Sequence, residues 1–258
     1  MCLILLAVNG RSDYPLVIAA NRDEFYERPS RPLAWWPESP GLLAGRDEHG
    51  GGTWLGITRR GRWAAVTNYR EVMPPRPDAA SRGGLVSDFL RGDDPPAAYL
   101  DHVMDRAGGY NGFNLLAGIG TEVWYASNRG GPPQRLTDGV HGLSNHRLNT
   151  PWPKVTRGRA RMRDILSRPG PPDEAALWAL LADRRRPPDP ELPDTGVGLD
   201  RERELAPLFI SGAQYGTRSS SLLWLSTAGH VTLIERTFRS VASPPPIEQT
   251  RRYEFCVG

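Results

Sequence analysis

The sequence lacks several features that mark common protein classes. None of its apolar runs approaches the roughly 18–20 residues that span a bilayer, which excludes a helical integral membrane segment. Two cysteines, Cys2 and Cys256, are too few for a disulfide framework or a four-thiolate zinc site. The five histidines show no paired metal spacing. We therefore expect neither a disulfide scaffold nor a metal centre.

Lysine is almost absent, since Lys154 is the only one among 32 basic residues. Acidic residues are interleaved with the arginines and the net charge is +3, so we expect no nucleic-acid partner. The glycine run at 50–52 lacks the Lys-Ser/Thr of a phosphate-binding loop, and no Gly-x-Ser-x-Gly motif or dinucleotide fingerprint occurs. The opening residues 1–8 lack the basic region and cleavage site of a signal peptide, so we expect a buried strand there and a cytoplasmic location.

The order of the elements predicts the fold class. With 258 residues, 39% hydrophobic and 24% charged, the chain has the composition of a globular protein, and we expect one domain over residues 1–258. Segments 28–52 and 184–204 are rich in proline and are expected to be loops. Strands are expected at 2–8, 15–20, 53–58, 63–67, 113–118, 122–126, 139–143, 219–225 and 230–235, and helices at 83–91, 95–107, 155–167 and 173–183. Groups of strands alternating with groups of helices predict an α+β fold, with two antiparallel sheets and helices outside.

Cys2 is a candidate nucleophile because of its position. If Met1 is removed, residue 2 carries both a thiol and an α-amine, whose ordinary pKa is about 7.7–8.0. That amine can accept the thiol proton directly or through a water molecule, so no second residue is needed as base. The alternative is that Cys2 is a small buried residue at the start of a core strand.

A polar cluster, Asn21-Arg22-Asp23-Glu24, follows the second expected strand. Strand alternation places Asn21 and Asp23 on one face and Arg22 and Glu24 on the other. We expect Asp23 to point at the end of the first strand, where a carboxylate would hold the α-amine and raise its pKa. Arg22 is then expected to face away. The alternative is a polar turn with local ion pairs.

Three further residues are candidates for binding charge. Asn68 ends an expected inner strand, where its amide would donate to a developing oxyanion. Asn145 lies in a second amide-containing segment, and Arg218 precedes the last hairpin as a potential fixed cation. Ordinary turns or a surface arginine would explain these residues equally well.

Taken together, the motifs resemble the NRDE family, of the transport and Golgi organisation type, over nearly the whole chain. The resemblance rests on Met1-Cys2 and on residues 20–25, 51–56, 67–70, 142–145, 148–154 and 215–219. This family is in turn similar to the N-terminal-nucleophile (Ntn) hydrolases of the choloylglycine hydrolase and penicillin acylase branch. The resemblance implies a four-layer αββα sandwich.

The resemblance also implies roles for individual residues. Cys2 matches the nucleophile, Asp23 the aspartate that holds the α-amine, and Asn68 the oxyanion-hole asparagine, while Asn145 and Arg218 match the later asparagine and arginine of the catalytic set. Substrate binding is assigned to five residues of the same motifs: Asn21, Arg22, Trp54, Tyr69 and Arg70. The chain departs from the branch at Ala20, where an Arg or Gln is usual.

The expected function is that of an Ntn-type cysteine hydrolase acting on a non-peptide C–N amide bond of a small molecule, with no cofactor required. The alternative is a non-catalytic binding or trafficking protein for haem, acyl-CoA or another amphipathic ligand on the same fold. Its aromatic lining would come from four tryptophans: Trp35, Trp36, Trp54 and Trp152. The sequence leaves the substrate and the oligomeric state open.

Overall fold

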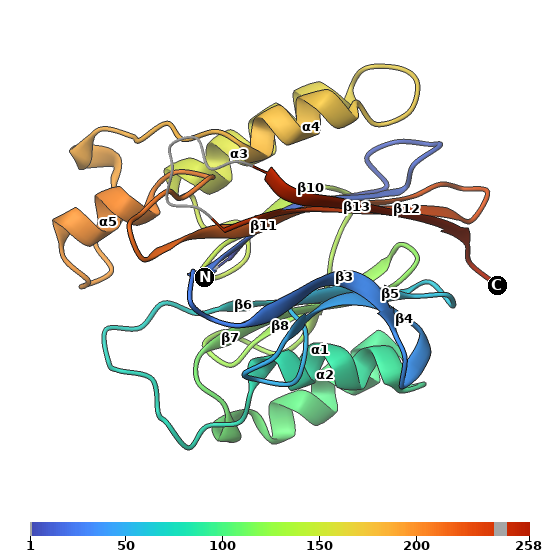
Figure 1. Cartoon of the computed structure of the whole chain (residues 1–258), viewed down its shortest axis with the longest axis horizontal. Coiled ribbons are helices and arrows are strands. Elements are labelled where there is room, and N and C mark those ends of the chain that lie inside the picture. The colour runs from blue at the N-terminus through green and yellow to red at the C-terminus, as the bar shows by residue number, and fades with distance from the viewer. Residues whose placement is uncertain (1, 240–246) are drawn as a thin grey trace.

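Two antiparallel sheets lie face to face with helices on both outer sides, as Figure 1 shows for the computed structural model, which describes residues 2–239 and 247–258. The first sheet has the order β10 (Gly139–Leu143), β1 (Cys2–Val8), β2 (Leu16–Phe25), β11 (Tyr215–Leu225), β12 (His230–Phe238) and β13 (Ile247–Cys256). The second has the order β3 (Ser30–Trp36), β4 (Ser39–Asp47), β5 (Leu55–Thr58), β6 (Arg62–Asn68), β7 (Phe113–Ile119), β8 (Glu122–Ser127) and β9 (Gln134–Arg135). The expected α+β class and αββα layering are confirmed.

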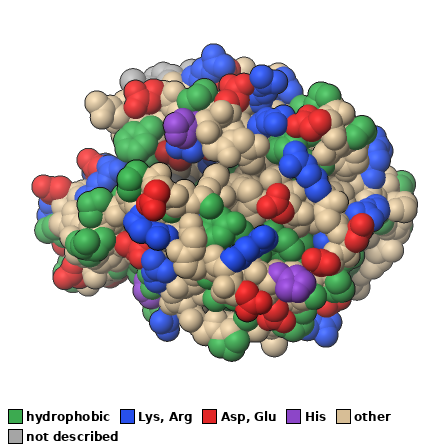
Figure 2. All heavy atoms as spheres, turned by 90° about the horizontal axis from the view of Figure 1, so that it is seen from below, with side chains coloured by type: hydrophobic (Ala, Val, Ile, Leu, Met, Phe, Trp, Pro, Cys, Tyr) green, Lys and Arg blue, Asp and Glu red, His purple; other side chains and the backbone are tan. Residues whose placement is uncertain are grey.

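The helices form the two outer layers. Helices α1 (Arg82–Arg91) and α2 (Pro96–Asp105) pack on the second sheet, and α3 (Pro153–Leu166) and α4 (Glu174–Leu181) pack on the first (Figure 1). Seen from below, the outer face of the molecule carries acidic and basic side chains interspersed with one another (Figure 2). The buried apolar side chains of α1 and α2 pack against those of the second sheet. None of the helices that the structure describes is long and apolar enough to cross a membrane.

Period-2 alternation in β1 decides which way the first residues of the chain point. Ile4 and Leu6 belong to the core between the two sheets, whereas Leu3 and Leu5 pack in the core beneath α3 and α4. Because side chains on one face of a strand are two residues apart, Cys2 shares the inter-sheet face with Ile4. The first residue of β1 therefore opens toward the space between the sheets.

Two segments expected to be loops contain regular structure. Residues 28–52 hold the hairpin β3–β4, and 184–204 hold a short 3₁₀ turn, Asp189–Glu191, and all but the last residue of α5 (Leu199–Leu205). This hairpin was not expected, because its strands contain proline and glycine. The pairing of the two strands is also irregular, with register shifts on either side of Ala34 and Trp35. Pro40 and Gly41, which read as loop residues, lie inside β4.

Two strand boundaries also differ from expectation. Strand β2 extends to Phe25, so residues 21–24 lie within a strand and not at its end. Strand β13 was not predicted, because it is an edge strand whose side chains are mostly exposed and polar, and an apolar pattern is therefore missing. Met1, whose removal would give Cys2 a free α-amine, lies outside the described residues.

Candidate active site

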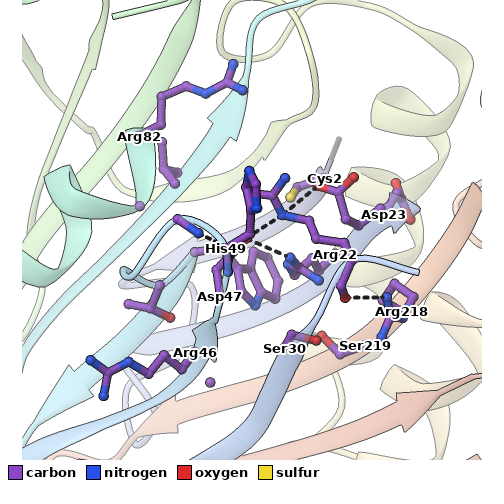
Figure 3. A pocket seen from close by; sticks show the side chains of 18 of the residues that line it. Cys2, Arg22, Asp23, Ser30, Arg46, Asp47, His49, Arg82, Arg218 and Ser219 are labelled. Carbon is purple, nitrogen blue, oxygen red and sulfur yellow. Dashed lines mark hydrogen bonds and ion pairs between the residues drawn. The ribbon is translucent and has the colours of Figure 1, made fainter. Parts of the chain in front are cut away.

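A cavity of about 530 Å³ opens where the strands of the two sheets end, and Cys2 is part of its wall. From the first sheet come Cys2, Arg22 and Asp23, together with Arg218 of β11. From the other side come Asn68 at the end of β6 and Arg82 at the start of α1. Figure 3 shows Cys2 between Arg82 on one side and Arg218 with Ser219 on the other. The sandwich thus brings together residues that are far apart in the sequence.

Cys2 is almost fully buried, and its backbone is fixed by a hydrogen bond. Its side chain is 7% exposed, and its carbonyl accepts a hydrogen bond from Ser144 Oγ at 3.3 Å. Burial raises the pKa of the Cys2 thiol, while Arg22 and a hydrogen bond from the Asp23 backbone act to lower that pKa. A reactive thiolate at this position therefore depends on the polar groups around it.

Arg22 faces the cavity, contrary to the expectation that it would point away. In the pairing of β1 with β2, Cys2 lies directly opposite Arg22, so both side chains are on the same face. The guanidinium Nη2 of Arg22 donates to Asp47 Oδ2 at 3.2 Å (Figure 3). The expected alternation along β2 is correct, but the expectation that Arg22 points away from Cys2 is wrong. The face that Arg22 shares with Cys2 follows from the register of β1 on β2, and neither strand's sequence shows that register.

Asp23 is buried next to the nucleophile and is held from two sides. Thr217 Oγ1 donates to Asp23 Oδ1 at 2.7 Å, and the Tyr215 hydroxyl donates to the Asp23 carbonyl at 3.0 Å. Burial raises the pKa of the Asp23 carboxyl, and the positive charge of Lys154 acts in the opposite direction. The side chain also interacts electrostatically with Cys2. Asp23 is therefore close enough to influence groups at the start of β1.

The two asparagines have different positions. Asn68 lines the cavity, whereas Asn145 is fully buried and lies outside the lining that the described residues form. Asn145 Nδ2 donates to the Asn68 carbonyl at 3.0 Å, and the Asn145 carbonyl accepts from the Arg70 amide at 2.7 Å. Asn145 thus fixes the backbone that presents Asn68.

The guanidinium group of Arg218 is hydrogen-bonded to backbone carbonyls. Its Nη1 donates to the carbonyls of Phe25, Tyr26 and Arg28 at 2.8, 2.8 and 3.1 Å. These bonds fix the turn that follows β2. Arg218 lines the cavity, and its Nη1 stabilises the backbone turn that forms part of the cavity wall.

The residues assigned to substrate binding separate into two groups. Arg22 and Trp54 line the cavity, and Asn21, Tyr69 and Arg70 lie outside the lining that the described residues form. Asn21 Nδ2 donates to the carbonyl of Leu181 in α4 at 2.9 Å and to that of Leu208, which follows α5, at 2.8 Å. Tyr69 packs on an imidazole ring with centroids 4.9 Å apart, and Arg70 pairs with buried Glu202 at 2.6 Å. A role for these three in binding substrate stays a prediction.

Sequence reasoning missed most charged residues of the cavity, and Asp47, Glu235 and Arg82 are three of them. Asp47 Oδ2 accepts from Arg28 Nε at 2.8 Å as well as from Arg22, and Asp47 ends a strand that was expected to be a loop. Glu235 is buried and accepts from the Leu33 amide at 2.7 Å, and burial raises the pKa of its carboxyl. Arg82 begins α1. The alternation of β12 could have flagged Glu235 as a charge on a buried face, but nothing in the sequence distinguishes Arg82 from other arginines.

No group of three or more His, Cys, Asp or Glu side chains among residues 2–239 and 247–258 is arranged to hold a metal ion. The chemistry available at this site is that of a thiol, carboxylates, amides and guanidinium groups.

Comparison with known proteins gives consistent matches over the full length. The family model described as Transport and Golgi organisation 2 matches residues 1–240. The Transport and Golgi organization 2 homolog of Mus musculus is 36% identical, and the corresponding Homo sapiens homolog is 37% identical, each with 99% of both chains covered. Among solved structures, a mutant conjugated bile acid hydrolase from Clostridium perfringens is similar, with a TM-score of 0.51 at 8% identity, covering 98% of this chain and 92% of that one. This last likeness shows the fold alone, and it is the Ntn-hydrolase-like fold that the sequence led us to expect.

Proposed function

The chain belongs to the Transport and Golgi organisation 2 family, and we propose that it is an Ntn-type cysteine hydrolase of non-peptide C–N amide bonds. One observation carries the proposal: the cavity joins Cys2, Asp23 and Asn68, which come from β1, β2 and the opposite sheet. A nucleophile, a carboxylate and an amide donor around one open space are the groups that acyl transfer requires.

The first half of the reaction is acylation of the enzyme. After removal of Met1, the Cys2 α-amine takes the thiol proton, and the sulfur attacks the amide carbonyl carbon to form a tetrahedral intermediate. Asn68 donates to the oxygen that gains negative charge. The ammonium then returns its proton to the leaving nitrogen as the C–N bond breaks, which releases the amine and leaves a thioester on Cys2.

The second half returns the enzyme to its starting state. The α-amine removes a proton from water, the resulting hydroxide adds to the thioester carbon, and the acid is released as the thiol is restored. Asp23 supports the amine in both halves, because a neighbouring carboxylate stabilises the ammonium form. Only side chains, the terminal amine and water take part, so the proposal includes no cofactor.

Arg22 supplies the cation that is usual in this branch at the position of Ala20. Ala20 and Arg22 are two residues apart on the same inter-sheet face of β2, and Arg22 is the direct partner of Cys2. Relative to the position of Ala20, the positive charge of Arg22 lies two residues further along β2, which brings it opposite Cys2. We propose that Arg22 favours the thiolate there.

Intact mass and single-turnover acylation test this function. We expect the purified protein to lack Met1 and to gain the mass of an acyl group at Cys2 when mixed with reactive N-acyl amides such as N-acyl p-nitroanilides. Cys2→Ala should remove both acylation and turnover while the protein stays folded, and Cys256→Ala should retain them. Turnover unaffected by Cys2→Ala would exclude the mechanism. Retained Met1 together with saturable binding of hemin or an acyl-CoA would favour the non-catalytic alternative.

A further inference from the structure

The cavity around Cys2 is rich in positive charge. Eight arginines and five acidic side chains line it. Five of these arginines are in ion pairs within 4 Å: Arg22, Arg28, Arg31, Arg46 and Arg239. For Arg76, Arg82 and Arg218, the hydrogen bonds that the guanidinium groups make among the described residues go to backbone carbonyls. A carbonyl fixes the direction of a guanidinium but does not neutralise its charge.

Of these three, Arg82 is the one that borders Asn68 in the cavity wall and interacts electrostatically with Cys2. Its Nη1 donates to the Gly112 carbonyl at 3.0 Å, and the same carbonyl accepts the Tyr69 amide at 2.9 Å. This places Arg82 beside the end of β6, next to Asn68. Burial lowers the pKa of Arg82, and among charged groups the Cys2 sulfur has the largest effect on that pKa. A guanidinium has five N–H donors, so further donors remain after the bond to Gly112.

The start of α1 is fixed in place by close backbone packing. Gly52 lies against Gly83, and a Cβ on Gly52 would collide with the Gly83 backbone. The Thr53 amide donates to the Gly83 carbonyl at 3.3 Å. Because α1 is anchored to the loop before β5, the position of Arg82 relative to β6 is set by backbone and not by a flexible loop.

We propose that Arg82 binds a carboxylate of the ligand close to the scissile carbonyl, so that the substrate is an amide with a carboxylate on its amine or acyl part. The inference rests on the proposed function for the ligand being an amide. A carboxylate and a guanidinium form two parallel N–H···O bonds in a planar arrangement, which gives geometric specificity as well as attraction. A neutral amide of the same shape would leave Arg82 without a counter-charge.

Two alkylating reagents of nearly equal shape test this subsite without turnover. Iodoacetate carries a carboxylate where iodoacetamide carries a neutral amide, and with both the thiolate displaces iodide as the S–C bond forms. The thiolate fraction of Cys2 affects both rates equally, so the ratio of the two rates reports attraction of the carboxylate alone. Cys256, which is exposed, serves as the internal reference in the same sample.

We expect the iodoacetate-to-iodoacetamide ratio to be higher at Cys2 than at Cys256 and to fall as salt is raised. Arg82→Gln should lower the ratio at Cys2 about fivefold, in line with a single charge acting over several ångströms at intermediate dielectric. Arg82→Lys should retain most of it. The matched control is Arg46→Gln, which removes a cavity arginine already paired with Glu38 at 2.5 Å and should leave the ratio unchanged.

The outcomes separate this inference from the proposed function. A wild-type ratio at Cys2 no higher than at Cys256 would overturn the subsite without any variant, as would equal ratios in wild type and Arg82→Gln. Failure of both reagents to reach Cys2 would contradict the open cavity and overturn it too. An Arg82-dependent ratio in a protein that never forms an acyl-enzyme would support the subsite and reject the hydrolase.

Discussion

Arg22 lies directly opposite Cys2 in the pairing of β1 with β2, and its guanidinium also pairs with Asp47 on the neighbouring wall of the cavity. Arg22 thus connects Cys2, the first residue of β1, with Asp47 in β4 of the other sheet. A buried thiol, whose pKa is raised by desolvation, therefore has a fixed positive charge on its own face of the sheet.

Removal of the Arg22 charge should make Cys2 less reactive at neutral pH. Because the cation lowers the pKa of the thiol, Arg22→Gln is expected to move the pH of half-maximal iodoacetamide alkylation upward. The rate at high pH should not change, since all thiols are ionised there. The measurement is a pH series of alkylation followed by peptide mass, with Arg31→Gln as a control that lines the cavity but is paired with exposed Glu48. Superimposable pH profiles for wild type and Arg22→Gln would contradict the role.

Asn68 and Asn145 should have separable effects on kinetics and stability. We expect Asn68→Ala to reduce kcat by about 10²–10³ with little change in KM or in the thermal midpoint, because an oxyanion donor acts mainly in the transition state. Asn145→Ala should instead lower the thermal midpoint, because it leaves the partly buried Asn68 carbonyl without its donor. Steady-state kinetics and thermal unfolding of both variants decide. Equal loss of stability in the two variants would mean that Asn68 is merely structural.

The Arg70–Glu202 pair should be a major contributor to stability. Both side chains are almost fully buried, so Arg70→Met leaves an uncompensated carboxylate and is expected to cost about 3–5 kcal/mol in free energy of unfolding. Urea denaturation measures this. As a matched control, Arg60→Met breaks the exposed pair with Asp93 and should change the free energy far less. A small effect of Arg70→Met would show that the pair is not tightly packed in solution.

Lys154 should give the protein a distinctive stability profile above neutral pH. Burial lowers its pKa from 10.5 to about 8, so between these values the unfolded chain binds a proton that the folded chain has lost. Stability rises with pH where the unfolded state holds more protons. The free energy of unfolding of wild type, relative to Lys154→Met, should therefore increase from about pH 8 to 10, by at most ~1.4 kcal/mol per unit. Urea denaturation at several pH values provides the curves, and a difference that stays constant across this window would contradict the shift.

Much of the local structure was predictable from residue patterns alone. Apolar runs located nearly every core strand, including β1 and the β11–β12 hairpin, and helical spacing located α1 to α4, because burial imposes a period on the sequence. Position in the chain marked Cys2, and the expected ends of strands marked Asp23 and Asn68, although Asp23 lies within β2. Edge strands such as β13 escaped because a strand exposed to solvent needs no apolar face.

Only the tertiary structure decided which of these residues share a cavity. Alternation along β2 gave the two faces correctly, but the face toward Cys2 follows from the register of β1 on β2, which depends on contacts between strands. Packing also decided that Asn145 hydrogen-bonds the Asn68 carbonyl, and that Arg82 lines the cavity at the start of α1, which is anchored against Gly52. Sequence fixes the kinds of chemical groups and their local periodicity, whereas distances between segments depend on how the sheets and helices pack. The sequence alone does not show whether a given arginine faces solvent, a carboxylate or a cysteine sulfur, because that depends on the packing of distant segments.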